Sequence, residues 1–368
     1  MPAPVNAEMI GGIPLVSVIG TPRTMGEHIG ERMKSRLQVL SQYLYEQLGS
    51  LAESARQGTP LSVEDQRRNL RDNATPTTTL EPALWMELAA MAGAADLPPE
   101  DLLQVHGFPD LLSRHRCRVP PSRSTFIALG PDHCDHRHTR LILAWHLDPT
   151  FLPYVTLIRR IPAHGPASVS LTLAGLHPVA GLSEAGIAVA ANDLRVEDGT
   201  NGHFTTHLLA ATLTAPSLED AVHRVTCGSR QGGRCIHLMT GQGQRVSVEL
   251  SGSQSCVLND PLPGSPRVHT NHALAEPIRA VLSVPHDDLS RQRLSHFASL
   301  AVAARDATPS EIASWFGLGE PAGSHRIQGA YACGATPDHT VLFIADPHSR
   351  QVHLHRGGTS CSLETITL

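Results

Sequence analysis

The sequence predicts an α+β protein built in layers, with largely antiparallel sheets. Residues 1 to about 112 place apolar side chains at helical spacing, and from Ser124 the spacing changes to strand-like alternation and continuous apolar runs. Groups of helices and groups of strands then follow one another to the end of the chain, which is typical of folds whose helices and sheets form separate layers. We find no internal repeat and no long low-complexity linker, so one domain with an N-terminal helical portion is the simplest interpretation.

The N-terminal portion contains three predicted helices. Residues 24–48 carry a continuous apolar stripe, and Thr24 and Glu27 are spaced as a capping box at its start. Residues 81–95 form a second helix, and the break at residues 97–100 starts a third. Residues 49–80 are polar and rich in Thr and Arg, so we expect a partly mobile connection there.

The rest of the chain alternates between predicted strands and predicted helices. A turn at residues 131–138 joins the first two strands into a hairpin. A helix is predicted to begin at Ser217, because Glu219 and Asp220 follow in its first turn. Strands are predicted at 124–130, 140–148, 154–161, 168–173, 186–191, 235–240, 245–250, 255–258, 340–346 and 351–356. Helices are predicted at 203–213, 217–226, 290–305 and 309–316.

Composition argues against several classes of protein. The 368-residue chain has a net charge of −5 and 4% aromatic residues, so we expect no nucleic-acid partner. It has no run of 18 apolar residues and no signal-like N-terminus, which predicts a cytoplasmic protein without a membrane segment. The seven cysteines are dispersed and lack CxxC spacing, which disfavours a disulfide framework or a zinc knuckle.

Two segments invite a metal or cofactor interpretation that we do not favour. His133, Cys134, Asp135, His136 and His138 could in principle ligate a metal, but such a cluster at a hairpin tip is more often a solvated turn. The glycine-rich residues 228–233 follow a helix and lack the Lys-Ser/Thr pair of a phosphate loop. We therefore expect neither a metal nor a cofactor. The sequence also has no G-x-S-x-G motif of an α/β-hydrolase.

Polar residues at the ends of predicted strands are the more informative signal. Asp148 ends the second strand, Asn192 ends another, and Asn271 lies in His269-Thr270-Asn271-His272. Carboxamides in such places can donate N–H groups to a developing oxyanion. Each of the three could equally cap a turn, since Asn and Asp do so commonly.

Taken together, the motifs resemble those of a known family. Residues 20–30 look like its opening helix, residues 81–93 like its second helical signature, and residues 340–357 like its final hairpin. Residues 181–189 resemble its GLN-x-x-GLAV turn, with Ser183 in place of Asn, and residues 269–272 match its HTNH motif. The family is that of the acyl-coenzyme A:6-aminopenicillanate acyltransferases, a cysteine-peptidase-like branch of the N-terminal nucleophile (Ntn) hydrolases related to the choloylglycine hydrolases.

The resemblance implies a four-layer αββα sandwich with an N-terminal helical segment, and self-cleavage that frees a nucleophile whose new α-amine is its base. On this basis residues 1–123 would be the helical segment, a candidate pro-segment, and residues 124–368 the Ntn-like body. Asp148 matches an aspartate that contacts the nucleophile's amine, and Asn192 and Asn271 match oxyanion asparagines. Arg326 matches an arginine in the substrate pocket.

The sequence departs from the family at the nucleophile. The family reads Gly-Cys-[Thr/Ser]-[Thr/Ser]-Phe, whereas a gapless match from Phe126 puts Arg123 in the cysteine position, and a shift of one residue puts Ser124 there. Serine can serve as the nucleophile after cleavage between Arg123 and Ser124. Arginine cannot, because it stays protonated, and it would instead bind an anionic substrate group.

Three functions remain open at this stage. The first is an amidohydrolase or acyltransferase acting through Ser124 on a small amide or thioester, such as an acyl-CoA, in secondary metabolism. The second is an uncleaved enzyme that uses the same pocket for other small-molecule chemistry, and the third is a non-catalytic binding protein. A homodimer is compatible with each of these functions.

Overall fold

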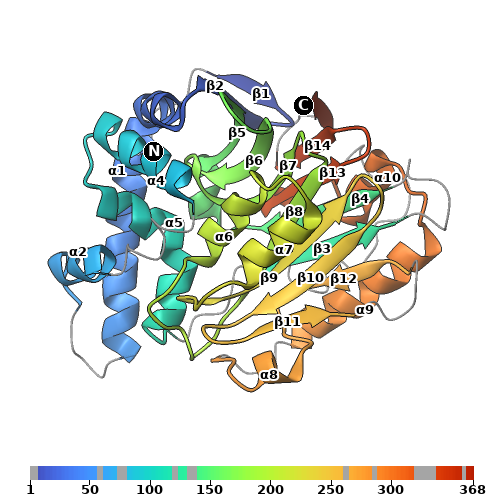
Figure 1. Cartoon of the computed structure of the whole chain (residues 1–368). Helices are drawn as coiled ribbons and strands as arrows, with labels where there is room; N and C mark the ends of the chain where they lie inside the picture. The colour runs from blue at the N-terminus through green and yellow to red at the C-terminus, as the bar shows by residue number, and fades with distance from the viewer. Residues whose placement is uncertain are drawn as a thin grey trace.

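Two stacked β-sheets form the centre of the computed structural model, which describes residues 7–55, 61–72, 81–117, 123–130, 139–259, 265–283, 288–318, 337–358 and 362–368 (Figure 1). The nine-stranded sheet has the order β1 (Glu8–Ile10), β2 (Ile13–Gly20), β5 (Val155–Pro162), β6 (Ser168–Leu173), β7 (Leu176–Ser183), β8 (Ile187–Leu194), β9 (Gly233–Thr240), β10 (Arg245–Leu250), β11 (Ser255–Leu258). The six-stranded sheet has the order β12 (Arg267–His269), β3 (Arg123–Leu129), β4 (Arg140–His146), β13 (Thr340–Asp346), β14 (Gln351–Arg356), β15 (Glu364–Thr367).

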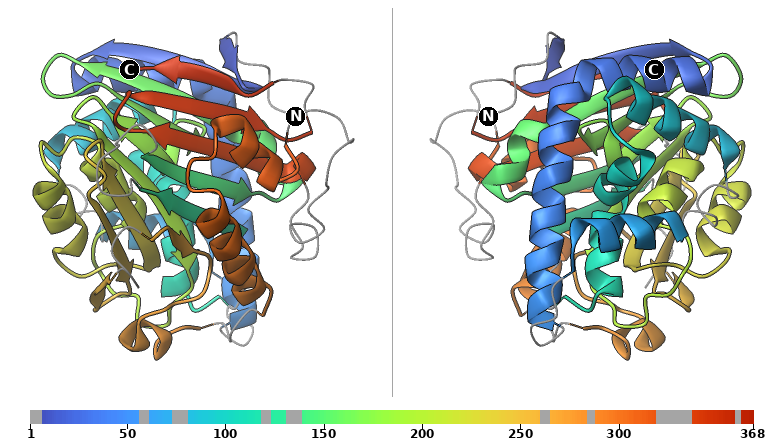
Figure 2. Two further views of the ribbon diagram at one scale, coloured as in Figure 1. Left: turned by 90° about the vertical axis from the view of Figure 1, so that its right-hand side faces the viewer. Right: turned by 90° about the vertical axis from the view of Figure 1, so that its left-hand side faces the viewer.

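Helices cover the outer face of each sheet, as the two side views show (Figure 2). The nine-stranded sheet carries α1 (Pro22–Ala55), α4 (Pro82–Ala94), α5 (Pro99–Arg114), α6 (Thr205–Thr212) and α7 (Leu218–Thr226), with α2 (Val63–Asp72) packed on α1 and α5. The six-stranded sheet carries α9 (Asp288–Ala303) and α10 (Pro309–Trp315). The short α8 (Glu276–Arg279) lies beside β11. The predicted four-layer αββα sandwich is therefore confirmed.

Alternation along β3 decides which of its side chains enter the space between the sheets. Phe126 and Ala128 belong to the core cluster that joins the two sheets, whereas Ile127 and Leu129 pack toward α9 and α10. Successive strand residues point to opposite faces. Ser124 therefore points inward with Phe126, toward β8 of the other sheet, while Arg123 and Thr125 belong to the opposite face.

Several local expectations need correction. Strand β2 was not expected; it pairs parallel to β5, whereas the other pairs of the nine-stranded sheet are antiparallel, as predicted. Helix α1 continues to residue 55 and α2 follows, where the sequence suggested a mobile connection. The predicted box at Thr24 does not form, because α1 begins earlier and the Thr21 hydroxyl accepts from the Thr24 N–H instead. The predicted cap at Ser217 is confirmed by its bond from the Asp220 N–H.

Among the described residues, no helix combines the length and the apolar character needed to cross a bilayer. Cys117, Cys227, Cys235 and Cys256 are free thiols.

Helices α1 and α4 cross at two glycines, which yields a stability prediction. A methyl group added at Gly30 would lie 2.3 Å from the Met91 carbonyl oxygen, and one at Gly26 would lie 2.1 Å from that of Glu87. Gly30→Ala is expected to destabilise the protein by about 1–3 kcal/mol, because one of the packed backbones must shift. Gly93→Ala on exposed α4 surface is the control: nothing lies within 4 Å of its added methyl group, so the substitution should leave or raise the melting temperature. Equal melting temperatures for both variants would contradict this account of the crossing.

Candidate active site

Three residues from three strands or strand ends meet between the sheets at Ser124. Asn192 on β8 donates its Nδ2 to the Ser124 Oγ at 2.7 Å, and Asn271, just after β12, donates its Nδ2 to the same oxygen at 3.2 Å. The Ser124 backbone N–H donates to the Asn271 Oδ1 at 2.8 Å. Ser124 is 2% exposed. The hydroxyl oxygen thus accepts from two amide donors, and among the described residues no carboxylate or imidazole forms a hydrogen bond with it.

The orientation of the Asn271 side chain follows from its partners. Its Oδ1 faces two groups that can only donate, the Ser124 backbone N–H and the Arg293 guanidinium at 2.9 Å. Its Nδ2 must therefore be the group that faces the Ser124 Oγ and the Asp193 carbonyl oxygen. The Asn271 backbone N–H donates to the Ser290 Oγ at the start of α9, so this helix fixes the loop as well as the side chain.

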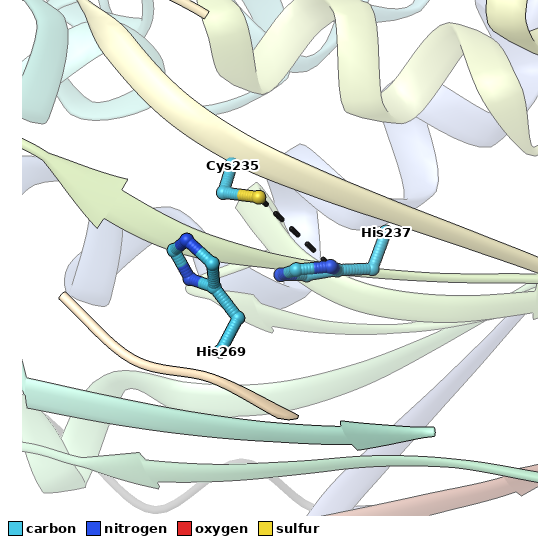
Figure 3. A group of neighbouring side chains, drawn as sticks. All are labelled: Cys235, His237 and His269. Carbon is cyan, nitrogen blue, oxygen red and sulfur yellow. Dashed lines mark hydrogen bonds between the residues drawn. The ribbon is translucent and has the colours of Figure 1, made fainter. Parts of the chain in front are cut away.

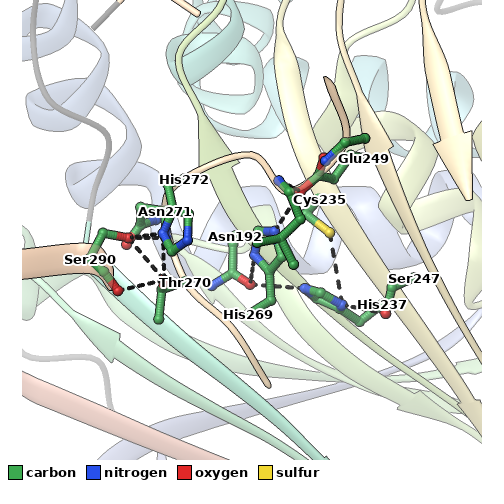
Figure 4. A network of polar contacts seen from close by, with 12 residues as sticks. Asn192, Cys235, His237, Ser247, Glu249, His269, Thr270, Asn271, His272 and Ser290 are labelled. Carbon is green, nitrogen blue, oxygen red and sulfur yellow. Dashed lines mark hydrogen bonds and ion pairs between the residues drawn. The ribbon is translucent and has the colours of Figure 1, made fainter. Parts of the chain in front are cut away.

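Behind Asn192 lies a buried polar network (Figure 4). The Asn192 Oδ1 lies 2.8 Å from the His237 Nε2 and 3.1 Å from the His269 Nδ1. The His269 Nε2 lies 2.9 Å from the Glu249 Oε1, and the His237 Nδ1 lies 2.8 Å from the Ser247 Oγ. All of these side chains are at most 2% exposed. The amide that faces Ser124 is therefore held from behind by two imidazoles.

Among the described residues, one group has side chains of the kinds that bind metal ions. It consists of Cys235, His237 and His269 (Figure 3). Their candidate ligand atoms lie within 4.8 Å of one another, and the Cys235 Sγ lies 3.9 Å from the His237 Nδ1. Tetrahedral zinc would hold such atoms about 3.3–3.6 Å apart. An ion would also displace Ser247 from the His237 Nδ1. The group fits a hydrogen-bond network better than a metal site. The cluster at residues 133–138 lies outside the described residues.

The structure brings together three of the six residues that the sequence singled out. Asn192 and Asn271 both contact Ser124, whereas the Arg123 side chain is exposed at the start of β3. Asp148 lies beyond the end of β4, is exposed, and accepts from the Thr150 N–H at 2.8 Å as the cap of a short 3₁₀ helix (Pro149–Tyr154). Arg326 lies outside the described residues.

The position of Asp148 changes what its replacement should do. The resemblance implied a contact with the nucleophile's amine and hence a large loss of activity. Its cap position instead predicts that Asp148→Asn leaves turnover unchanged and alters stability by less than about 0.5 kcal/mol, since asparagine and aspartate cap comparably well. The Thr150 hydrogen bonds lower the pKa of the Asp148 carboxyl, so any stabilisation by its charge is lost as the pH falls through that lowered pKa. A large loss of turnover in Asp148→Asn would instead support the contact with the nucleophile's amine that the resemblance implied.

Four further residues of the cluster were not predicted from the sequence. His237 and Glu249 lie within predicted strands, His269 ends β12, which was not predicted, and Arg293 lies on a predicted helix. Arg293 is 1% exposed, and its charge reaches His146, whose pKa falls to about 3 through burial, then through Arg293 and Arg123. A signal was present for His269, which belongs to the same four-residue motif as Asn271.

In the described part of the chain, a cavity of about 70 Å³ lies apart from this cluster. It is lined by α4, α5, α6 and residues of β5, β6 and β7, including His106, Arg160 and His207. No member of the Ser124 cluster contributes to it.

Comparisons with known proteins find distant structural similarity. No family model and no curated protein matches the chain. Among solved structures, a variant of the conjugated bile acid hydrolase from Clostridium perfringens is 12% identical, with a TM-score of 0.44 over 66% of this chain and 92% of that chain. The penicillin V acylase from Agrobacterium tumefaciens is 12% identical, with a TM-score of 0.32 over 67% of this chain and 86% of that chain. Likeness at this level says nothing about activity.

Proposed function

We propose that the protein is an amide hydrolase or acyltransferase whose nucleophile is Ser124, freed by cleavage of the Arg123–Ser124 bond. The observation that carries this proposal is that Asn271 holds both the backbone nitrogen and the hydroxyl oxygen of Ser124. Ntn chemistry requires these two atoms of one residue to be held together, since the freed amine serves as base for the hydroxyl. The absence of a side-chain base on the Oγ, within the described part of the chain, supports the same choice.

Self-cleavage would begin with the Ser124 Oγ adding to the Arg123 carbonyl carbon. The C–N bond breaks, the Ser124 nitrogen takes the proton, and an ester forms between the Arg123 acyl group and the Oγ. Water then hydrolyses this ester, leaving a carboxylate on Arg123 and a free amine on Ser124. The N-terminal piece would remain bound, because β2 is part of the nine-stranded sheet and α1, α4 and α5 share its core.

Turnover would use the same atoms on a small-molecule amide or thioester. The amine of Ser124 accepts the hydroxyl proton, the Oγ attacks the acyl carbon, and the proton passes to the leaving amine or thiol. Asn192 and Asn271 place two N–H donors beside the attacking oxygen, where they can stabilise the negative charge that develops on the acyl group. Water or an acceptor amine then takes the acyl group from the Oγ.

The proposal is tested by trapping the acyl group. Purified protein is mixed with p-nitrophenyl acetate, hexanoate or phenylacetate and with the matching p-nitroanilides, and is then quenched and analysed by mass spectrometry. The expected result is an acyl adduct on the peptide that begins with Ser124. Adduct on another residue, with none on Ser124, would contradict the proposal.

A further inference from the structure

The His269 imidazole lies between two hydrogen-bond acceptors. Its Nδ1 faces the Asn192 Oδ1 and its Nε2 faces the Glu249 carboxylate. A neutral imidazole carries one N–H, so it can donate to only one of them. With Asn192 donating to Ser124 and Glu249 ionised, both contacts are satisfied only when His269 carries two N–H groups and a positive charge.

Glu249 has the surroundings of an ionised carboxylate. Burial alone would raise its pKa, but the hydrogen bond and charge of His269, with the backbone N–H groups of Leu274 and Ala275, lower it below its ordinary value. These two N–H groups donate at 2.6 and 2.8 Å. A buried ion pair is tolerated when further hydrogen bonds satisfy its remaining groups, and these contacts do so on the Glu249 side.

His237 plays the opposite part in the network. Burial, followed by the charges of His269 and Arg267, lowers its pKa well below the ordinary value, so it is neutral. Its Nδ1 then accepts from the Ser247 hydroxyl while its Nε2–H donates to the Asn192 Oδ1. Its ring lies on Phe126, with centroids 3.5 Å apart and planes 4° apart, which limits any rotation.

We propose that Glu249 and His269 form a buried carboxylate–imidazolium pair that positions and polarises Asn192 as a donor to the Ser124 Oγ. A positive charge behind the Asn192 Oδ1 draws electron density from the amide, which strengthens the hydrogen bonds that its Nδ2 donates. Glu249, His269 and His237 are thus positioning residues, because they act on Ser124 through Asn192. The inference deepens the proposed function and rests on it for its effect on turnover, but the ion pair itself can be detected without any substrate.

The first test reads protonation directly. Protein labelled with ¹⁵N-histidine is examined at pH 7 by long-range ¹H–¹⁵N NMR, with the His269 signals assigned by their loss in His269→Gln. Two protonated nitrogens are expected for His269 and one for His237, which serves as the internal reference. In Glu249→Gln, His269 should become singly protonated. A singly protonated His269 in the unmodified protein would overturn the proposal: either Glu249 would then carry the proton, or the Asn192 amide would be reversed, its Oδ1 accepting from the Ser124 hydroxyl.

The second test measures the effect on turnover of an acyl p-nitroanilide. Glu249→Gln should lower kcat about tenfold with little change in KM, because the donor to Ser124 is weakened and not removed. Glu87→Gln is the matched control: it also removes a buried glutamate charge, paired with Arg160 on the outer side of the nine-stranded sheet, and should leave kcat unchanged. Equal kcat losses in both variants would contradict a positioning role. If the unmodified protein hydrolyses no probe, the proposed function fails, while the NMR result still decides whether the ion pair exists.

Discussion

Replacing Ser124 with alanine is expected to abolish both cleavage of the chain and hydrolysis of an acyl p-nitroanilide. The loss in kcat should be on the order of 10⁴-fold or more, as for other enzymes that lose a nucleophile. Ser124→Cys should retain part of both activities, because a thiol can carry the same chemistry in the same place. Thr125→Ser is the control, since Thr125 is the next residue of β3 and points to the opposite face of the sheet. Full hydrolysis by Ser124→Ala would remove Ser124 from the mechanism.

The same experiment separates Ser124 from Arg123. The sequence left both residues as candidates for the nucleophile position, and the inward face of β3 favours Ser124 because its hydroxyl meets the two asparagines. Arg123→Ala should therefore still yield a cleaved, active enzyme, since cleavage uses its backbone carbonyl and not its exposed side chain. A larger loss in Arg123→Ala than in Ser124→Ala would instead support an uncleaved protein that binds an anion through Arg123.

Replacement of Asn271 should have the next largest effect. Asn271→Ala removes one of two donors at the Ser124 Oγ, which predicts a loss in kcat of about 10²–10³-fold with little change in KM. Asn271→Asp separates its two roles, because the carboxylate can still accept from the Ser124 nitrogen and from Arg293 but cannot donate to the Oγ. It should therefore retain the fold while losing kcat, and its melting temperature should fall because it also loses the hydrogen bond to the Asp193 carbonyl oxygen. An increase in KM at constant kcat would show that Asn271 binds the ground state of the substrate.

Much of the fold was predictable because buried strands show their pattern in the sequence. The expected bounds of β6, β10, β11, β13 and β14 coincide with the observed ones. Strands β1, β2, β7, β12 and β15 were missed. The apolar run of β2 precedes a long helix, and its parallel partner β5 lies more than a hundred residues away. Pairing at that distance leaves no local signal.

The candidate site was only partly predictable, for a similar reason. Asn192 and Asn271 stood out as carboxamides near strand ends, and in the structure both donate a hydrogen bond to the Ser124 Oγ. Asp148 stood out in the same way, but β4 ends at His146 and the chain turns into a 3₁₀ helix, which carries the carboxylate to the surface. Glu249 and His269 could not be paired beforehand, because their contact depends on how a β10 side chain reaches β12 across the gap between the two sheets.

The central claim is that the chain cuts itself before Ser124, and the mass of the freshly purified protein tests it most directly. Denaturing liquid chromatography with mass spectrometry should resolve two polypeptides, residues 1–123 and residues 124–368, that elute together in native gel filtration. Edman degradation of the larger one should begin Ser-Thr-Phe. Ser124→Ala, prepared in parallel, should give one full-length chain. A single chain of 39.5 kDa from the unmodified protein, persisting through prolonged incubation, would contradict the claim.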